Sequence, residues 1–589
     1  MPGYNGGMEL DWSTILSTIY VVLDFVIKVL AVGFVPENRR PSSSTAWLLL
    51  ILFLPIVGLP LFLLIGSPYI SRRRHEIQAR ANESLDDGLA HLPTVPEGIE
   101  VPPGIATLVT LNRRLTALPG LTGTIEAIHH DYVGSFQAMA AAVEGARDYV
   151  HVEIYITAWD DTSDILLSAM SRAVERGVEV RLLFDHIGSM KYPGFRHLGR
   201  RLDAAGIAWR YMLPIQPLRG RWRRIDLRNH RKLVVVDGDV AFVGSQNLID
   251  SSYLLRGNVR AGRHWYDAMA ELTGDIVAEV EAVFAVDWYT ETEERLDPDH
   301  YLHIEQQPAR ADIPGRRPTR PLPAAVRAVD RDGDREAHES REVQSPHAAH
   351  GSHGPQGADR SPASVEPREW LGSEVYHRSA PRGSTVASAS GAGLERHRGG
   401  VIPGPHLAAL QIVPSGPGFT TEPNLRLFTS LLHLAERRMT ICSPYFVPDE
   451  SLLAAVTTAA YRGVEVELFV NEQADQFMVG HAQASYYRAL LDAGVVIRLY
   501  PAPAVLHTKF VVVDGIAGVF GSSNLDMRSF GLNYEISLFG YGGGFVRPLD
   551  ELAHVYRERC RVLTPEEWSE RSLLLRYVDN ACRMTSALQ

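Results

Sequence analysis

Two long apolar runs lie near the start of the sequence, at residues 14–34 and 45–65. Each has about the 20 residues that a helix needs to cross a bilayer. The first run contains Asp24 and Lys28, which are four residues apart and could pair on one face of a helix. We therefore predict a two-helix transmembrane hairpin over residues 1–70. A cleaved signal peptide is the alternative for the first run, but the run lacks a basic leader and a small-residue cleavage site.

Basic residues near the runs predict how the hairpin is oriented. Arg72, Arg73 and Arg74 follow the second run, whereas Arg39 and Arg40 lie in the short connecting loop. Cytoplasmic segments carry the excess of Lys and Arg. The small excess after the second run predicts a catalytic region in the cytoplasm. Residues 71–105 read as a polar connector.

Beyond the connector, the pattern of strands and helices occurs twice. The peptide RGVEV is present word for word in both copies, and LDAAG in the first answers LDAG in the second. Repetition of a whole unit with alternating helix and strand predicts two α/β halves with a mixed sheet flanked by helices, over residues 106–304 and 406–589. The predicted elements are a strand at 151–157, a helix at 167–177, a strand at 178–185 and a helix at 195–206, answered by 438–448, 452–463, 464–470 and 485–494.

Residues 305–405 separate the two halves and are rich in Pro, Gly, Ser, Arg, His and Glu. Such a segment has too few apolar residues to fold alone, so we predict a disordered linker. The formal net charge of the chain is −11, which argues against general nucleic-acid binding through a basic surface. Three widely spaced cysteines predict no disulfide framework.

One polar motif is written in both halves. HRKLVVVD begins at His230 and is followed by GSQN, and HTKFVVVD begins at His507 and is followed by GSSN. In both copies His, Lys, Asp, Gly and Asn occupy offsets 0, 2, 7, 14 and 17. The polar residues at these offsets, with the serine of each GSxN segment, are His230, Lys232, Asp237, Ser245, Asn247 and His507, Lys509, Asp514, Ser522, Asn524.

The residue types of the motif suit phosphoryl chemistry. Histidine and lysine two apart on a strand point to the same face. One imidazole can attack phosphorus and hold a covalent intermediate, while a second protonates the leaving oxygen and later deprotonates the acceptor. Lysine and asparagine can hold the phosphate oxygens as charge develops. This chemistry needs no metal and no cofactor, and we predict neither.

The duplicated HxKxxxxD and GSxN motifs resemble the phospholipase D superfamily. The resemblance covers roughly residues 125–295 and 408–565, and it implies two half-domains that pair about a pseudo-twofold axis and share one active site. The segment ENRRPSSSTAWLLLILFLPIVGLPLFLLIG also resembles the membrane hairpin of bacterial cardiolipin synthases. That branch implies transfer of a phosphatidyl group between two phosphatidylglycerol molecules, giving cardiolipin and glycerol.

The same resemblance implies roles for single residues. The N-terminal motif more often supplies the nucleophile, so His230 is expected to attack and His507 to act as general acid and base. The motif residues Asp237 and Asp514 hold the architecture of such sites more than they touch substrate. A further carboxylate usually orients each histidine. Glu535, which lies 28 residues after His507, and Asp267, which lies 37 residues after His230, fit that role within their own halves.

The first half carries an arginine-rich insertion before its motif, namely Arg219, Arg221, Arg223, Arg224 and Arg228. These side chains could bind lipid phosphates or hold the domain to an anionic membrane, and a solvated basic loop is the plain alternative. Glu153, Tyr155, Tyr445 and Phe446 lie on strands next to the motifs and are either core residues or pocket wall.

Three other functions compete with a membrane-bound cardiolipin synthase. A phospholipase D or another phosphatidyltransferase would use water or a different alcohol as acceptor, which the motifs do not specify. A nuclease of the same superfamily is disfavoured by the apolar runs and the acidic balance. A catalytically inactive lipid-binding scaffold would have no need for two intact His–Lys pairs. The sequence leaves the acyl-chain preference and the oligomeric state open.

Overall fold

The computed structural model describes residues 12–36, 41–66, 76–296 and 400–586, apart from residues 82, 84–88, 90, 97, 216–223, 404–406, 420 and 585. Most of the predicted linker, residues 305–399, lies outside the described residues. The exception is its end, because Val401–Pro403 forms strand β10 and pairs with β1 (Leu121–His129). The described part of the chain therefore resumes within the predicted linker.

The first half is built on a mixed sheet in the order β4-β3-β2-β6-β7-β9-β1. The pairs within β2, β3 and β4 are parallel, and all others in this half are antiparallel. The remaining strands are β2 (Tyr149–Ile154), β3 (Glu179–Asp185), β4 (Ala208–Met212), β6 (Lys232–Val236), β7 (Val240–Gly244) and β9 (Met269–Thr273). The longer helices are α6 (Tyr132–Glu144), α7 (Asp164–Glu175), α9 (Phe195–Ala204) and α11 (Ile276–Thr292).

The second half repeats this sheet in the order β15-β14-β12-β17-β18-β20-β11, with β12, β14 and β15 parallel. Its strands are β11 (Leu407–Ser415), β12 (Arg438–Cys442), β14 (Glu465–Asn471), β15 (Val496–Tyr500), β17 (Phe510–Val513), β18 (Ala517–Gly521) and β20 (Asn533–Tyr541), with β21 (Arg561–Val562) beside β15. Its longer helices are α14 (Pro423–His433), α15 (Glu450–Tyr461), α16 (Phe477–Ala493), α18 (Gly543–Arg557) and α20 (Leu573–Arg583), with the short α19 (Pro565–Ser569) before α20.

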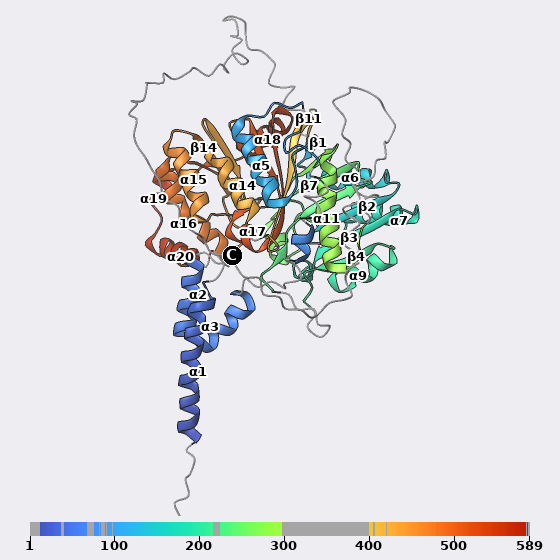
Figure 1. Cartoon of the computed structure of the whole chain (residues 1–589). Coiled ribbons are helices and arrows are strands. Elements are labelled where there is room, and N and C mark those ends of the chain that lie inside the picture. The colour runs from blue at the N-terminus through green and yellow to red at the C-terminus, as the bar shows by residue number, and fades with distance from the viewer. Residues whose placement is uncertain are drawn as a thin grey trace, which may run out of the picture. The chain divides into compact units, whose positions relative to one another are not determined.

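The two halves share one sheet and one core. Strand β1 pairs antiparallel with β11, so the two sheets run into each other. A single cluster of buried side chains contains Ile125 and Leu272 of the first half together with Leu410 and Leu538 of the second. Figure 1 shows helices on both sides of this joined sheet. The predicted α/β class with two similar halves is confirmed.

Glycine ends equivalent helices in both halves, as the sequence predicts. Gly177 follows α7 with φ +88°, and Gly463 follows α15 with φ +93°. Residues with a β-carbon rarely adopt this left-handed backbone, so glycine is the residue that closes each helix and starts the next strand. The RGVEV repeat is the turn from helix to strand in both halves.

One helix of the first predicted half packs with the second. Helix α5 (Pro103–Thr116) contributes Ile105, Leu108 and Val109 to a cluster whose other members come mainly from α14, α15 and the second sheet. The Asn112 side chain donates a hydrogen bond of 2.9 Å to Gln411 on β11. The boundary at residue 106 is therefore displaced, because the apolar face of α5 fits the second core. The repeat did not reveal this packing, since α5 precedes the repeated unit.

The first apolar run forms one helix, and the second does not. Helix α1 (Trp12–Phe34) is long and apolar enough to cross a membrane, and Lys28 and Asp24 pair at 2.8 Å. The predicted helix at 45–65 is broken into α2 (Pro41–Phe53), α3 (Pro55–Leu61) and a π-helical turn (Phe62–Gly66). Proline disfavours helical backbone at the residue before it, and the break falls at Leu54, before Pro55.

Candidate active site

The two motif histidines line one cavity, and short strands that cross between the halves bring them there. Strand β5 (Arg228–Asn229) precedes His230 and pairs parallel with β20 of the second half. Strand β16 (Val505–Leu506) precedes His507 and pairs parallel with β8 (Trp265–Tyr266) of the first. The cavity has a volume of about 510 Å³ and is lined by residues of both halves. The sequence-based prediction of one shared site is consistent with this arrangement.

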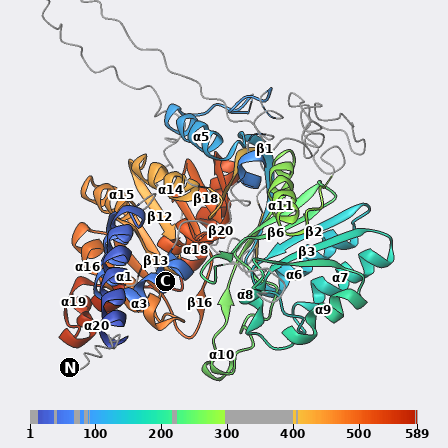
Figure 2. The same cartoon turned by 60° about the horizontal axis from the view of Figure 1, so that its bottom comes forward.

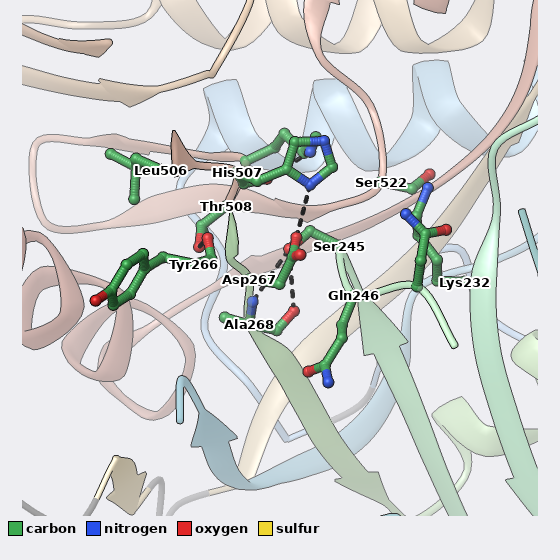
Figure 3. Close-up of polar contacts among 12 residues, drawn as sticks. Lys232, Ser245, Gln246, Tyr266, Asp267, Ala268, Leu506, His507, Thr508 and Ser522 are labelled. Atoms are coloured by element: carbon green, nitrogen blue, oxygen red, sulfur yellow. Dashed lines mark hydrogen bonds and ion pairs between the residues drawn. The ribbon is translucent and has the colours of Figure 1, made fainter. Parts of the chain in front are cut away.

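Each histidine is held by a carboxylate from the opposite half. His507 Nδ1 lies 2.7 Å from Asp267 Oδ1, and His230 Nδ1 lies 3.0 Å from Glu535 Oε2. Figure 3 marks the contact between His507 and Asp267 with a dashed line. The sequence identified both carboxylates but assigned each to the histidine of its own half, and that pairing is wrong. The reason is the strand crossing: β8 leads directly into Asp267, and β20 contains Glu535.

Backbone and serine contacts add to the carboxylates that hold the two histidines. His230 Nδ1 also lies 3.1 Å from the carbonyl oxygen of Ser522, which can only accept a hydrogen bond. The proton of His230 is therefore on Nδ1, and Nε2 carries the lone pair. Ser522 Oγ donates to Glu535 at 2.5 Å, and Ser245 Oγ accepts from the Ala268 backbone at 3.1 Å. Both predicted serines thus brace the strands that carry the carboxylates.

The lysines lie behind the histidines, fully buried. Lys232 Nζ donates to the carbonyl oxygen of its own His230 at 2.6 Å, and Lys509 does the same to His507. Burial lowers the pKa of Lys232 well below its ordinary value and that of Lys509 to about 8. The positive charge of each lysine therefore acts mainly on the neighbouring histidine. Burial, followed by the charge of these lysines, lowers the pKa of both imidazoles, His230 the further of the two.

The two carboxylates have opposite electrostatics. Burial raises the pKa of Glu535 to about 7, against the lowering effect of Lys232. Burial would also raise the pKa of Asp267, but the charge and hydrogen bond of His507, together with Lys509, hold that pKa below its ordinary value. Asp267 is therefore ionised beside His507, whereas Glu535 is partly protonated beside His230. The pseudo-symmetric site thus has two electrostatically different ends.

The motif aspartates stand at the far ends of their strands, away from the histidines. Asp237 accepts hydrogen bonds of 2.8, 2.9 and 2.8 Å from the backbone N–H groups of Arg147, Asp148 and Tyr149. Asp514 accepts the equivalent three from residues 436–438 at 2.7–2.8 Å. This position fits the expected architectural role, because five residue steps along the strand, about 17 Å of chain, lead from Lys to Asp in each motif. They fix the loop that leads into β2 and into β12.

The family model for "Cardiolipin synthase, PLD-like domain" matches residues 139–288 and 428–554, the two halves that supply these groups. A second match, to "Phospholipase_D-nuclease N-terminal", covers residues 16–67. The chain belongs to the phospholipase D-like family.

Named relatives match along the whole chain. A cardiolipin synthase of Geobacillus kaustophilus is 27% identical, with 100% of this chain and 95% of the relative covered. Cardiolipin synthase A of Edwardsiella ictaluri is 28% identical, with 96% of this chain and 98% of the relative covered. Among solved structures, a phosphatidylserine synthase of Haemophilus influenzae Rd KW20 is 15% identical, with a TM-score of 0.49 over 82% of this chain and 99% of its own.

Both family-motif asparagines line the cavity. The Asn247 side chain accepts from the Ile156 backbone at 3.1 Å and donates to the Tyr253 hydroxyl at 2.7 Å. Tyr155 and Tyr445 also line the cavity, and their rings approach His230 and His507 edge-on at centroid distances of 5.1 and 6.4 Å. Glu153 and Phe446 are buried in the protein interior.

Of the predicted arginines, Arg219, Arg221 and Arg223 lie outside the described residues. Arg224 pairs with the neighbouring Asp226. Arg228 is buried, pairs with Asp185 at 3.0 Å and lines the cavity. Its counterpart in the second half is Val505, so only the His230 end has a cation at this position.

Sequence reasoning missed several cavity residues outside the motifs. At the His230 end these include Asp526, Arg528 and Asn533, and at the His507 end Tyr253, Asn258 and Trp265. Their position next to named residues was the available signal: Arg528 comes four residues after Asn524, and Trp265 two before Asp267. The cavity thus has charged side chains of both signs around His230, and Tyr253, Trp265 and Tyr445 around His507.

Proposed function

We propose that this protein is a membrane-associated cardiolipin synthase that transfers a phosphatidyl group from one phosphatidylglycerol to another. The observation that carries the proposal is the pair of imidazoles on one cavity, each held through Nδ1 so that Nε2 is available to substrate. Full-length similarity to cardiolipin synthases supports the substrate class.

The reaction follows from two nitrogen atoms with different tasks. His230 Nε2 attacks phosphorus, the bond from phosphorus to the glycerol oxygen breaks, and His507 protonates that oxygen so that glycerol leaves. The terminal hydroxyl of a second phosphatidylglycerol then attacks the phosphatidyl–histidine. His507 takes the hydroxyl proton, the P–N bond breaks, and cardiolipin is released with His230 regenerated.

The electrostatics support His230 as the nucleophile. A nucleophilic imidazole must be neutral, and the pKa of His230 is lowered well below its ordinary value by burial. An acid catalyst must hold a proton, and ionised Asp267 opposes the lowering of the His507 pKa by burial, so this pKa falls less than that of His230. The guanidinium groups of Arg228 and Arg528 at the His230 end can donate hydrogen bonds to the phosphate diester that this histidine would attack.

Product analysis with trapping tests the function. Purified protein in phosphatidylglycerol liposomes should release glycerol and cardiolipin in equal amounts, and both His230→Ala and His507→Ala should abolish the release. Acid-quenched wild type should carry a phosphorus label on His230, and His507→Ala should carry it only with a donor whose leaving group needs no proton. Phosphatidic acid as the product would instead mean that water is the acceptor.

The membrane arrangement is a second part of the proposal. We place the catalytic part in the cytoplasm because Arg72, Arg73 and Arg74 follow the apolar segment. Helix α1 is the segment that crosses. In the second run, Gly58 of α3 lies tightly against Ile51 of α2, so the two short helices are folded together. Cysteines introduced at Tyr4 and Asp161, labelled from either side of the membrane, test the count: labelling from one side requires two crossings, and from opposite sides one.

A further inference from the structure

Several exposed apolar side chains that the reaction does not use lie next in sequence to residues that line the cavity. Lys191, Asn258 and Gln476 line the cavity, and the residue next to each is an exposed apolar one: Met190, Val259 and Phe477. Single exposed apolar residues are common on protein surfaces. These three, drawn from both halves, place exposed apolar side chains next to residues that line the cavity.

Helix α20 extends this apolar surface from the second half. Its first turn contains Leu573 and Leu574, which are 80% and 72% exposed, and Tyr577 one turn on is 73% exposed. Its opposite side is fixed to α16, because Asp579 pairs with His481 at 2.7 Å. The Arg583 guanidinium also lies 4.5 Å from the centroid of the Tyr486 ring of α16. The two helices run in the same direction, so Leu574 lies toward the end of α16 that carries Phe477 and Met478.

The other flank of the mouth is basic. Helix α10 (Arg256–Ala261) carries exposed Val259 between Arg256 and Arg260, and Arg263 follows the helix. The segment from 255 to 263 contains no acidic residue. Figure 2 brings this side forward and shows α8 (His186–Met190) and α10 on one side of β16, with α16 and α20 on the other. Apolar and cationic side chains together suit an anionic lipid surface.

We propose that this apolar rim, defined as Met190, Val259, Phe477, Met478, Leu573, Leu574 and Tyr577, inserts into an anionic bilayer and opens the cavity directly onto the lipid headgroups. The proposal deepens the proposed function and rests on it for the nature of the substrate. A cavity of about 510 Å³ has the size that holds a drug-sized ligand, not a whole two-chain phospholipid. With the rim inserted, a headgroup enters while its acyl chains stay in the membrane.

Site-directed fluorescence tests insertion without any need for turnover. In the full chain with Cys560→Ser and Cys582→Ser, a cysteine is introduced at Phe477, at Leu574 or at Tyr461 and labelled with an environment-sensitive dye. Tyr461 on α15 is the matched control, because it is 70% exposed, against 69% for Phe477, and it does not line the cavity. Proteoliposomes contain phosphatidylglycerol and, in parallel samples, lipids with a nitroxide on the acyl chain.

Dyes at positions 477 and 574 should shift to shorter wavelength and be quenched by the nitroxide lipids, and the dye at 461 should do neither. Equal behaviour at all three positions would overturn the proposal. So would a shift without quenching at 477 and 574, because that result means a protein contact, such as a second copy of the chain. Quenching in a protein that turns over no phospholipid would keep the rim and reject the cardiolipin synthase function.

Activity supplies the second readout. The variant Phe477→Ser with Leu574→Ser should lose roughly tenfold in turnover of long-chain phosphatidylglycerol in vesicles. The reason is that the variant lacks the free energy gained when these two apolar side chains move from water into the bilayer. It should keep wild-type turnover of a short-chain phosphatidylglycerol dissolved below its micelle concentration. Tyr461→Ser should match wild type with both substrates. An equal loss with both substrates would contradict insertion and indicate damage to the cavity.

Discussion

At the scale of single residues, the active site depends on side chains exchanged between the halves. Asp267 comes from the first half and holds His507, and Glu535 comes from the second and holds His230. A change in one half should therefore impair the histidine of the other. This exchange makes the roles of the two carboxylates separable by kinetics.

A donor with a nitrophenolate leaving group separates them, because its departure needs no proton from His507. With this donor, Asp267→Asn should give a burst of nitrophenolate near the wild-type rate, followed by slow turnover. Glu535→Gln should slow the burst on the order of 10²-fold, less than the ~10⁴-fold that loss of the correct tautomer costs a Ser-His-Asp triad, since Ser522 still holds Nδ1. Rapid-mixing absorbance measures both phases. If Asp267→Asn slowed the burst and Glu535→Gln slowed only the later turnover, each carboxylate would act on the histidine of its own half.

Glu535 also predicts how stability depends on pH. Its pKa is raised to about 7 in the folded protein from an ordinary 4.5, so its contribution to stability is full below the lower value and is lost as pH rises through the higher one. Between pH 6 and pH 8 wild type should lose about 1 kcal/mol relative to Glu535→Gln. Denaturant unfolding in detergent at the two pH values measures the difference. A constant difference would mean that Glu535 does not titrate in this range.

The sequence identified the two cavity histidines better than the partners of these histidines. The repeated motif contains both histidines and both lysines, because the chemistry requires fixed spacing along one strand. Asp267 and Glu535 were found as well, but sequence separation favoured the nearer histidine. Only the crossing of β5 and β16 reverses that choice, and such pairing between distant strands leaves no local signal in the chain.

At the scale of elements, the motif aspartates act on loops. Each carboxylate accepts hydrogen bonds from three consecutive backbone N–H groups at the start of the first of the three parallel strands in its half. Both adopt left-handed backbone, with φ of 53° at Asp237 and 55° at Asp514, which Asn tolerates better than Ala. The short turn after Val236 and Val513 is thereby joined to the loop before β2 and β12.

Asp237→Asn should accordingly lower the free energy of unfolding by about 1–3 kcal/mol, because a neutral amide oxygen accepts hydrogen bonds from the backbone N–H groups more weakly than a carboxylate does. Asp237→Ala should cost more, because it adds backbone strain and leaves three donors without an acceptor. Turnover measured well below the melting temperature should stay within a few-fold of wild type. Thermal melting beside cardiolipin formation checks both, with exposed Asp161→Asn as the control. A large loss of turnover with unchanged melting would place Asp237 in the chemistry after all.

Helices were predicted where a repeat or a glycine defined them, and misplaced where packing decides. The α7 and α15 ends follow from Gly177 and Gly463. The assignment of α5 fails because the apolar pattern of a helix does not say which sheet the helix covers, and α5 packs with the second half. In the second apolar run, composition predicts one long helix, but Pro55 and the small Gly58 let the chain break and fold against itself.

At the scale of the whole molecule, the two halves are mutually dependent. They share a sheet through β1 and β11, a core, and two histidine–carboxylate pairs. The composition of residues 305–399 is that of a linker, and we propose that this segment only connects the two halves. The join should then be dispensable while the interface is not.

A chain broken after His350 tests this dependence. The two fragments, expressed together, should copurify in detergent through a tag on one of them and form cardiolipin with the pH dependence of the intact chain. The reason is that folding either half alone would expose the apolar surface around Leu410 and Leu272 and leave Asp267 or Glu535 buried without its histidine. Each fragment expressed alone should therefore be insoluble or inactive. Activity from the second fragment alone would show that one half can pair with a copy of itself and supply both histidines, which the unlike ends of the cavity argue against.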